Sequence, residues 1–293
     1  MLPNLSAQTS HFMHVLSMAC LLLSSTCLVA APLSPIPLGT NQLQIEENNF
    51  RFSIFDPEGK VIAPAHKGAG ASLNGYALSV KKQIDGTTFQ LASKKGELAQ
   101  LKIIHHDGHT AITITPEKPA TANKPHQIAL QLGGMPVAYG LGDTGGWNPT
   151  LNLVNDQETT YKITHDGGKH RWLSSFIIFP NNNFASVTFD GLARSVSLSK
   201  SNFKTTVTAA GPATFHYFTG SMEDIYASYQ KLLRAKGYPV IKPKFRLFEL
   251  GWESWAALGW QTNASTMLDS ITNFQENGFP IRWAVSGSGF WED

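Results

Sequence analysis

Apolar and polar side chains alternate in short runs from Leu43 to about Phe218, and this pattern constrains the fold more than any other feature. The clearest alternating positions are Phe50, Phe52 and Ile54, then Ile112 and Ile114, Val187 and Phe189, and Val196 and Leu198. Residues two apart lie on the same face of a β-strand, so each run predicts a strand with one buried face. Turn-forming residues separate the runs at Asp56-Pro57-Glu58-Gly59, Asp85-Gly86, Asp107-Gly108 and Asp190-Gly191. We therefore expect a mainly β chain in which residues 40–238 form an antiparallel β-sandwich.

A helical period replaces the alternation at Ser221, where Ser221-Met222-Glu223-Asp224 has the composition of a capping box. The apolar positions that follow lie on one helix face, and they are Ile225, Tyr229, Leu232 and Leu233. Gly237 can end this helix, because glycine readily adopts the left-handed conformation found after helices. The proline-flanked run 238–243 comes next, and we place the domain boundary there.

The segment 239–293 has the pattern of a β-α-β unit. Apolar runs from Leu247 to Trp252 and from Ile281 to Val285 predict two strands of the kind found in parallel sheets. Between them Asn263 can cap a second helix, which Gly278-Phe279-Pro280 would end. Its inward positions are expected to be Met267, Ile271 and Phe274. About 250 residues are usual for an eight-stranded (β/α)8 barrel, so this segment can supply only the opening of one.

The N-terminal segment resembles an export signal. An apolar stretch runs from Val15 to Ala31, and no Lys or Arg precedes Arg51. Because Val29-Ala30-Ala31 offers small residues for cleavage, we expect residues 1–31 to be a signal peptide and the protein to be secreted or periplasmic. A membrane anchor is the alternative. Cys20 and Cys27, the two cysteines of the chain, both lie in this segment, so the mature protein would have neither disulfides nor a thiol nucleophile.

The composition excludes partners of extreme charge. Charged residues make up 15% of the chain and the net charge is +2, so there is no basic stripe for nucleic acid. A surface that is neutral and polar suits a neutral ligand such as a sugar.

Four segments, in order, resemble boxes of the glycoside hydrolase family 31 (alpha-glucosidase-like) sequences. They are Ala138-Tyr139-Gly140-Leu141-Gly142-Asp143, the run from Phe215 to Pro243 around the first helix, Leu250-Gly251-Trp252-Glu253-Ser254-Trp255, and Asn273 to Ile281. The resemblance covers the N-terminal portion of that family. It implies a galactose-mutarotase-like sandwich followed by the first β-α-β unit of a truncated (β/α)8 barrel.

The same resemblance implies a retaining glycosidase or transglycosylase that needs no metal or organic cofactor. In the family both catalytic groups are aspartates on later barrel strands, so none of the residues here receives a catalytic role, and the fragment alone is expected to be inactive. We expect the coding sequence to continue after Asp293. The family has L-D-x-D where this chain reads Ser286-Gly287-Ser288-Gly289, which leaves the sugar undetermined.

Barrel active sites lie at the carboxyl ends of the strands, which selects the candidate substrate-binding residues. They are Trp252, Glu253 and Trp255 after the first strand and Trp291, Glu292 and Asp293 after the second. Indole rings stack on sugar faces and carboxylates accept bonds from hydroxyls. The alternative for Trp252 and Trp255 is that they fill space between the domains, and for Glu253 that it has a partner within the protein.

A loop that follows the Tyr-Gly-Leu-Gly box resembles a family 31 loop that reaches over the barrel mouth, which adds Asn155 and Asp156 as candidate sugar contacts. These two residues could instead form an Asx turn. The run His105-His106-Asp107-Gly108-His109 could suggest a metal site, but adjacent strand residues point to opposite faces, and we interpret it as a solvated hairpin tip.

Three functions are compatible with this sequence: part of an exported glycosidase acting on an oligosaccharide or glycoside, a non-catalytic carbohydrate-binding β-sandwich protein, or a degenerate product. The exposed edge of a two-strand parallel unit argues against the last two as stable states. No nucleic acid is expected as a partner, and no membrane after signal cleavage. The sequence leaves the oligomeric state open.

Overall fold

A computed structural model describes residues 33–121, 124–142, 150–151, 157–163, 173–191, 193–238 and 249–287. The predicted signal peptide, residues 1–31, lies outside these ranges. None of the helices within them has the length and apolar content that crossing a membrane would require.

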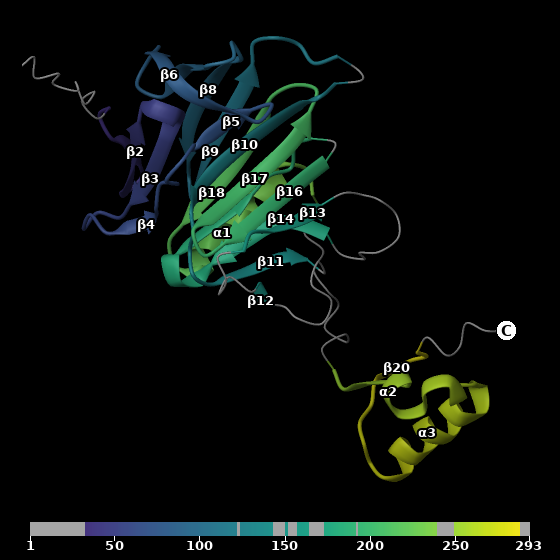
Figure 1. The fold of residues 1–293 in the computed structure, drawn as a ribbon. Coiled ribbons are helices and arrows are strands. Elements are labelled where there is room, and N and C mark those ends of the chain that lie inside the picture. The colour runs from purple at the N-terminus through teal and green to yellow at the C-terminus, as the bar shows by residue number, and fades with distance from the viewer. Residues whose placement is uncertain are drawn as a thin grey trace, which may run out of the picture.

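Most of the described chain forms one antiparallel sheet of 14 strands (Figure 1). Its strands, in spatial order, are β12(Thr150–Leu151), β11(Ala138–Gly142), β14(Leu173–Phe179), β15(Phe184–Val187), β18(Ala213–Thr219), β9(His109–Pro116), β8(Leu98–His106), β7(Thr88–Ser93), β6(Tyr76–Gln83), β5(Ala71–Leu73), β10(His126–Gly133), β17(Asn202–Ala209), β16(Ala193–Ser199) and β13(Thr159–Ile163). The predicted turns at Asp85-Gly86, Asp107-Gly108 and Asp190-Gly191 fall between strands of this sheet, which confirms them.

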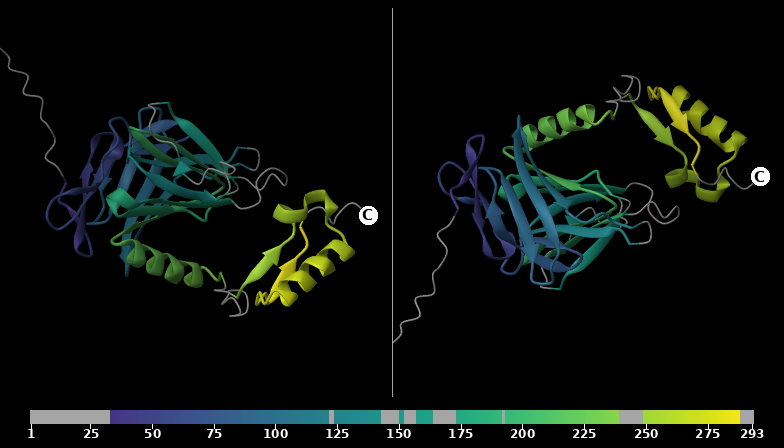
Figure 2. Two further views of the ribbon diagram at one scale, coloured as in Figure 1. Left: turned by 90° about the horizontal axis from the view of Figure 1, so that it is seen from below. Right: turned by 90° about the horizontal axis from the view of Figure 1, so that it is seen from above.

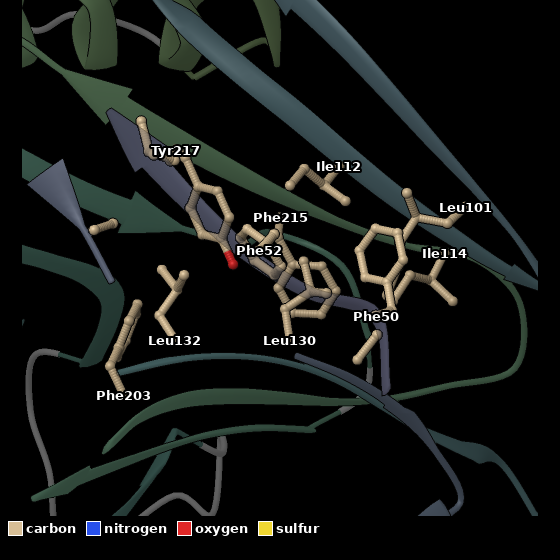
Figure 3. Packing of buried hydrophobic residues seen from close by; sticks show 14 of the residues in the cluster. Phe50, Phe52, Leu101, Ile112, Ile114, Leu130, Leu132, Phe203, Phe215 and Tyr217 are labelled. Carbon is tan, nitrogen blue, oxygen red and sulfur yellow. The ribbon is translucent and has the colours of Figure 1, made fainter. Parts of the chain in front are cut away.

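The long sheet folds over, so that its two halves face each other across one core. Phe203 of β17 packs on Phe179 of β14 with ring centroids 4.9 Å apart, although the two strands belong to opposite halves. Figure 3 shows Phe203 among aliphatic and aromatic side chains of both halves, including Leu132 and Tyr217. Burial of these side chains stabilises the fold, and the expected mainly β architecture is confirmed.

A smaller sheet of four antiparallel strands covers part of this core. Its strands are β1(Ile36–Leu38), β2(Asn41–Glu46), β3(Arg51–Phe55) and β4(Val61–Ala63), and η1(Asn48–Phe50) joins the middle two. Phe52 stacks on Tyr217 of β18 at 6.1 Å, and Phe50 meets Phe89 of β7 edge-on at 5.9 Å. Another short turn, η2(Pro180–Asn182), connects β14 to β15.

Helix α1(Met222–Ala235) packs on the outer face of the sheet (Figure 2). The predicted capping box is present: the Ser221 hydroxyl accepts from the Asp224 amide, and the Asp224 carboxylate accepts from the Ser221 amide. The predicted inward positions Ile225 and Leu232 are buried against Ala185, Val187 and Phe218. The helix therefore begins at the predicted residue and buries the predicted apolar side.

Residues 249–287 form a separate β-α-β arrangement. Strands β19(Gly251–Glu253) and β20(Trp283–Val285) are paired in parallel, and α2(Trp255–Leu258), η4(Gly259–Gln261) and α3(Ala264–Glu276) lie between them in the chain. Asn263 and Thr266 form a capping box at the start of α3. The strands are shorter than predicted, since residues 249–250 and 281–282 are not part of them. The short helix α2 was not predicted.

Candidate functional site

The carboxyl ends of β19 and β20 are held together by the hydroxyl of Ser254, which is fully buried. Its Oγ accepts from the backbone N–H of Gly287 at 2.8 Å and from the Thr262 hydroxyl at 3.3 Å. The Ser254 amide also donates to the Val285 carbonyl at 3.1 Å. Because these bonds join the residues that follow each strand, they fix the local geometry of the edge where a ligand site is expected.

Residue 287 lies too close to its neighbours to carry a side chain, which explains the glycine at this position. A Cβ at this position would overlap Trp255 and the Glu253 carboxylate. The family 31 sequences carry acidic residues in this stretch, whereas here residue 287 has no room for any side chain.

Glu253, Trp255 and Trp260 surround this edge. The Glu253 Oε1 accepts from the Trp255 backbone N–H at 2.9 Å, which fixes the carboxylate beside the indole. Trp255 and Trp260 meet edge to face with centroids 5.0 Å apart, and 67% of the Trp260 surface is exposed. We call Glu253, Trp255 and Trp260 the tryptophan patch. It offers the exposed indole of Trp260 and, beside Trp255, a carboxylate that can accept hydrogen bonds.

Sequence reasoning missed Trp260, because the run from Trp255 to Gln261 has neither a strand nor a clear helical period. The available signal was the glycine that directly precedes Trp260, because glycine often ends a helix. In the structure Gly259 has φ 52°, and α2 ends there. Trp260, the next residue, packs against Trp255.

The side chain of Trp252 lies on the other face of the strand pair. It packs edge to face on Phe274 of α3 at 5.6 Å, and it lines a groove of about 300 Å³ together with Phe279. Trp252 therefore fills space between strand and helix, a variant of the packing alternative considered for it. Its role as a sugar contact stays a prediction.

The face away from α3 is apolar but uncovered among the described residues. By the parallel register Gly251 pairs with Trp283 and Glu253 with Val285, so these four residues share that face. Trp283 and Val285 are 37% and 48% exposed, and the Trp283 indole lies over Gly251. Strands of parallel sheets are normally covered on both faces, so the exposure of Trp283 and Val285 is unusual for strands of this kind.

The other candidate residues, Asn155, Asp156, Trp291, Glu292 and Asp293, lie outside the described residues. The histidine run does form a hairpin tip, since β8 ends at His106 and β9 begins at His109. Within the described ranges, no group of three or more His, Cys, Asp or Glu side chains is arranged so that it could hold a metal ion.

A polar cavity of about 540 Å³ lies on the sandwich, between the β8–β9 turn, β18 and the start of α1. Asn41, Asp56, Asn183 and Thr219 contribute amide, carboxylate and hydroxyl groups to its lining. The Asn41 amide donates to the Thr219 hydroxyl at 2.8 Å, which fixes one wall. Groups of this kind can bind hydroxyl-rich ligands.

No protein-family model matches this chain, and no curated protein matches it. Solved structures resemble it at low identity. A GH31 dextranase of Flavobacterium johnsoniae complexed with isomaltotriose aligns over 86% of this chain and 32% of its own, with a TM-score of 0.39 and 11% identity. A GH31 family sulfoquinovosidase from E. rectale aligns over 78% and 39%, with a TM-score of 0.45 and 11% identity. This chain therefore spans well under half the length of either enzyme.

A proposed aldose 1-epimerase from Escherichia coli K12 aligns over 66% of this chain and 99% of its own, with a TM-score of 0.43 and 7% identity.

Proposed function

We propose that this chain is a carbohydrate-processing protein, and more narrowly the N-terminal part of an exported, retaining glycoside hydrolase of the family 31 type. In this proposal residues 40–238 are the galactose-mutarotase-like sandwich, and residues 239–293 open the catalytic barrel. The signal peptide is residues 1–31, and the protein works outside the cytoplasm.

The observation that carries the proposal is the parallel pairing of β19 and β20 with α3 between them in the chain, directly after a β-sandwich. This order of elements is the one that the four family-like segments imply. The uncovered apolar face with Trp283 and Val285 is what the inner face of an unfinished barrel would present.

The chemistry would be divided between this chain and further polypeptide. Retention requires two carboxyl groups about 5 to 5.5 Å apart, one attacking the anomeric carbon and one serving as acid and then base. These groups would come from later barrel strands. The tryptophan patch would hold the sugar, with Trp260 stacking on a ring face and Glu253 accepting bonds from hydroxyls. Trp291, Glu292 and Asp293 are proposed to complete the same rim.

Sugar binding by the chain tests this proposal. We expect maltotriose or isomaltotriose to change the tryptophan fluorescence saturably, with a Kd of roughly 1 mM because only part of the site is present. The variant Trp260→Ala should bind about tenfold more weakly, since the stacking surface is lost. Glu253→Gln should weaken binding as well, because a neutral amide is a poorer acceptor than a carboxylate.

The matched control is Tyr226→Ala, which removes an aromatic ring of similar exposure, 63%, from α1. Its sugar affinity should equal that of the unchanged chain. Equal affinity of Trp260→Ala would contradict the role of the patch. Hydrolysis of a nitrophenyl α-glycoside by this chain would contradict the placement of the catalytic acids on later strands.

The polar cavity of the sandwich favours a second candidate function, that of a non-catalytic carbohydrate-binding protein. The two functions predict different sensitive residues. If Asn183→Ala abolishes sugar binding while Trp260→Ala leaves it unchanged, the cavity rather than the barrel edge is the binding site.

A further inference from the structure

Three histidines, two from the β8–β9 hairpin and one from β18, gather beside α1. The rings of His106 and His109 stack with centroids 4.8 Å apart, and the ring of His109 lies 5.2 Å from that of His216 on β18. We call these three residues the histidine cluster. The hairpin tip is therefore not merely solvated, because its last histidine packs against a buried one.

His216 is buried without a hydrogen-bond partner. His216 is only 5% exposed, and neither nitrogen of its ring has a hydrogen-bond partner among the described residues. Most buried polar groups in proteins are paired, so an orphaned imidazole needs an explanation. His126 is a useful contrast, since it is also buried but its Nε2 lies 2.9 Å from the Lys118 carbonyl oxygen.

Helix α1 and the residues after it close this region. Phe189 packs on His216 at 5.9 Å, and Tyr238, just beyond the helix, packs on Phe189 at 5.7 Å. Lys236 lies 5.9 Å from the Phe189 ring. Lys236 and Tyr238 directly follow α1, so displacement of the helix together with these two residues would remove the groups that pack on Phe189, which itself packs on His216.

The charges around the cluster oppose protonation. Burial, and after it the charges of His109, Lys236 and His106, lower the pKa of His216 to about 3. Burial, His106, His105 and Lys236 lower the pKa of His109 to about 4. Asp107 at the hairpin turn is the neighbouring carboxylate, but it pairs with Lys231 of α1. Across the strand, Asp190 accepts from the Thr214 amide, and Tyr229 of α1 packs on Phe176 and Phe218.

We infer that the histidine cluster is a pH-sensitive latch, which keeps α1 docked on the sandwich at neutral pH and releases it when the medium becomes acidic. Release would expose His216 and allow it to take up a proton. Because α1 is the last described element before β19, the latch would control the attachment of the segment that leads to the β-α-β unit. This inference does not depend on the proposed function.

The sign of the effect follows from the direction of the shift. A histidine with a lowered pKa in the docked state binds fewer protons there than in the released state, where its pKa is near 6.5. Docking is therefore unaffected above about pH 6.5 and weakens as the pH falls towards the docked value. For His216 alone, with values of about 3 and 6.5, the docking equilibrium falls about 25-fold between pH 7 and pH 5.

Hydrogen exchange of the full chain tests the latch. Protection factors of α1 amides, corrected for the intrinsic rate at each pH, should fall about 25-fold from pH 7 to pH 5, while those of β10 and β17 fall much less. The variant His216→Phe places a ring that cannot titrate among Phe189 and Phe218, and it should remove this pH dependence. His216→Gln cannot titrate either, so the same loss of pH dependence is expected even if its α1 is less protected at both pH values.

The control is His126→Gln, which changes a buried histidine outside the cluster and should leave the pH dependence of α1 intact. Equal protection of α1 at pH 5 and pH 7 in the unchanged chain would overturn the latch. A parallel loss of protection in α1 and in the sheet would also overturn it, because this would mean global unfolding. Persistence of the pH dependence in both His216 variants would assign the effect to another group.

Discussion

Replacement of Phe203 by alanine is expected to destabilise the sandwich by about 3 to 5 kcal/mol, the range for removing a large aromatic ring from a packed core. Phe203 is 2% exposed and lies on β17. Its ring contacts Phe179 at 4.9 Å and Phe184 at 6.4 Å, both from the facing half of the long sheet. The substitution therefore leaves a cavity at the point where the two halves meet.

Urea unfolding followed by far-UV circular dichroism measures this effect. The midpoint should fall while the slope stays unchanged, because the folded and unfolded surfaces remain similar. Phe203→Leu should recover part of the loss, since it refills part of the volume. Tyr76→Ala, on the 44% exposed side chain of β6, is the matched control and should cost less than about 1 kcal/mol. A cost for Phe203→Ala as small as that of the control would show that the halves do not pack through this ring.

The sequence predicts the strands but not how the sheet closes. Alternation at Phe52, Ile54, Ile112 and Ile114 identifies buried faces, because the period of two is a local property of the backbone. The pairing of β10 with β17 and of β9 with β18 joins segments far apart in the chain. No local pattern specifies such partners, so the fold-over at Phe203 could be found only from the structure.

In the candidate sites, too, features set by neighbouring residues were predictable from the sequence, whereas features set by strand pairing were not. The capping boxes at Ser221 and Asn263 were predictable, since capping depends on residues within one turn. The histidine cluster was not, because His216 is brought to His109 only by the pairing of β18 with β9. At the strand ends, the sequence predicts Glu253 and Trp255 as candidate ligand contacts, whereas the position of Trp260 against Trp255 is known only from the structure.

Replacement of Gly140 by alanine is expected to cost roughly 2 to 4 kcal/mol, because strained backbone and steric overlap act together at this position. Gly140 has φ 129°, a conformation that residues with a side chain rarely adopt. A Cβ there would also overlap the carbonyl oxygen of Phe176 on β14. The pairing of β11 with β14 is irregular between Gly140 and Gly142, and Leu141 between them is fully buried with φ 62°.

Substitutions at two other glycines, Gly75 and Gly86, distinguish the cost of backbone strain from the cost of steric overlap. Gly75, between β5 and β6, has φ 82° but open space around it, so Gly75→Ala should cost only the backbone term of about 1 to 2 kcal/mol. Gly86 has open space without that conformation, so Gly86→Ala should be nearly neutral. The urea midpoint should be lowest for Gly140→Ala, intermediate for Gly75→Ala and highest for Gly86→Ala. If Gly140→Ala were no worse than Gly75→Ala, the close approach to β14 would not explain the glycine in the Tyr-Gly-Leu-Gly box. If the order holds, the glycine in this box is explained by the packing of β11 on β14.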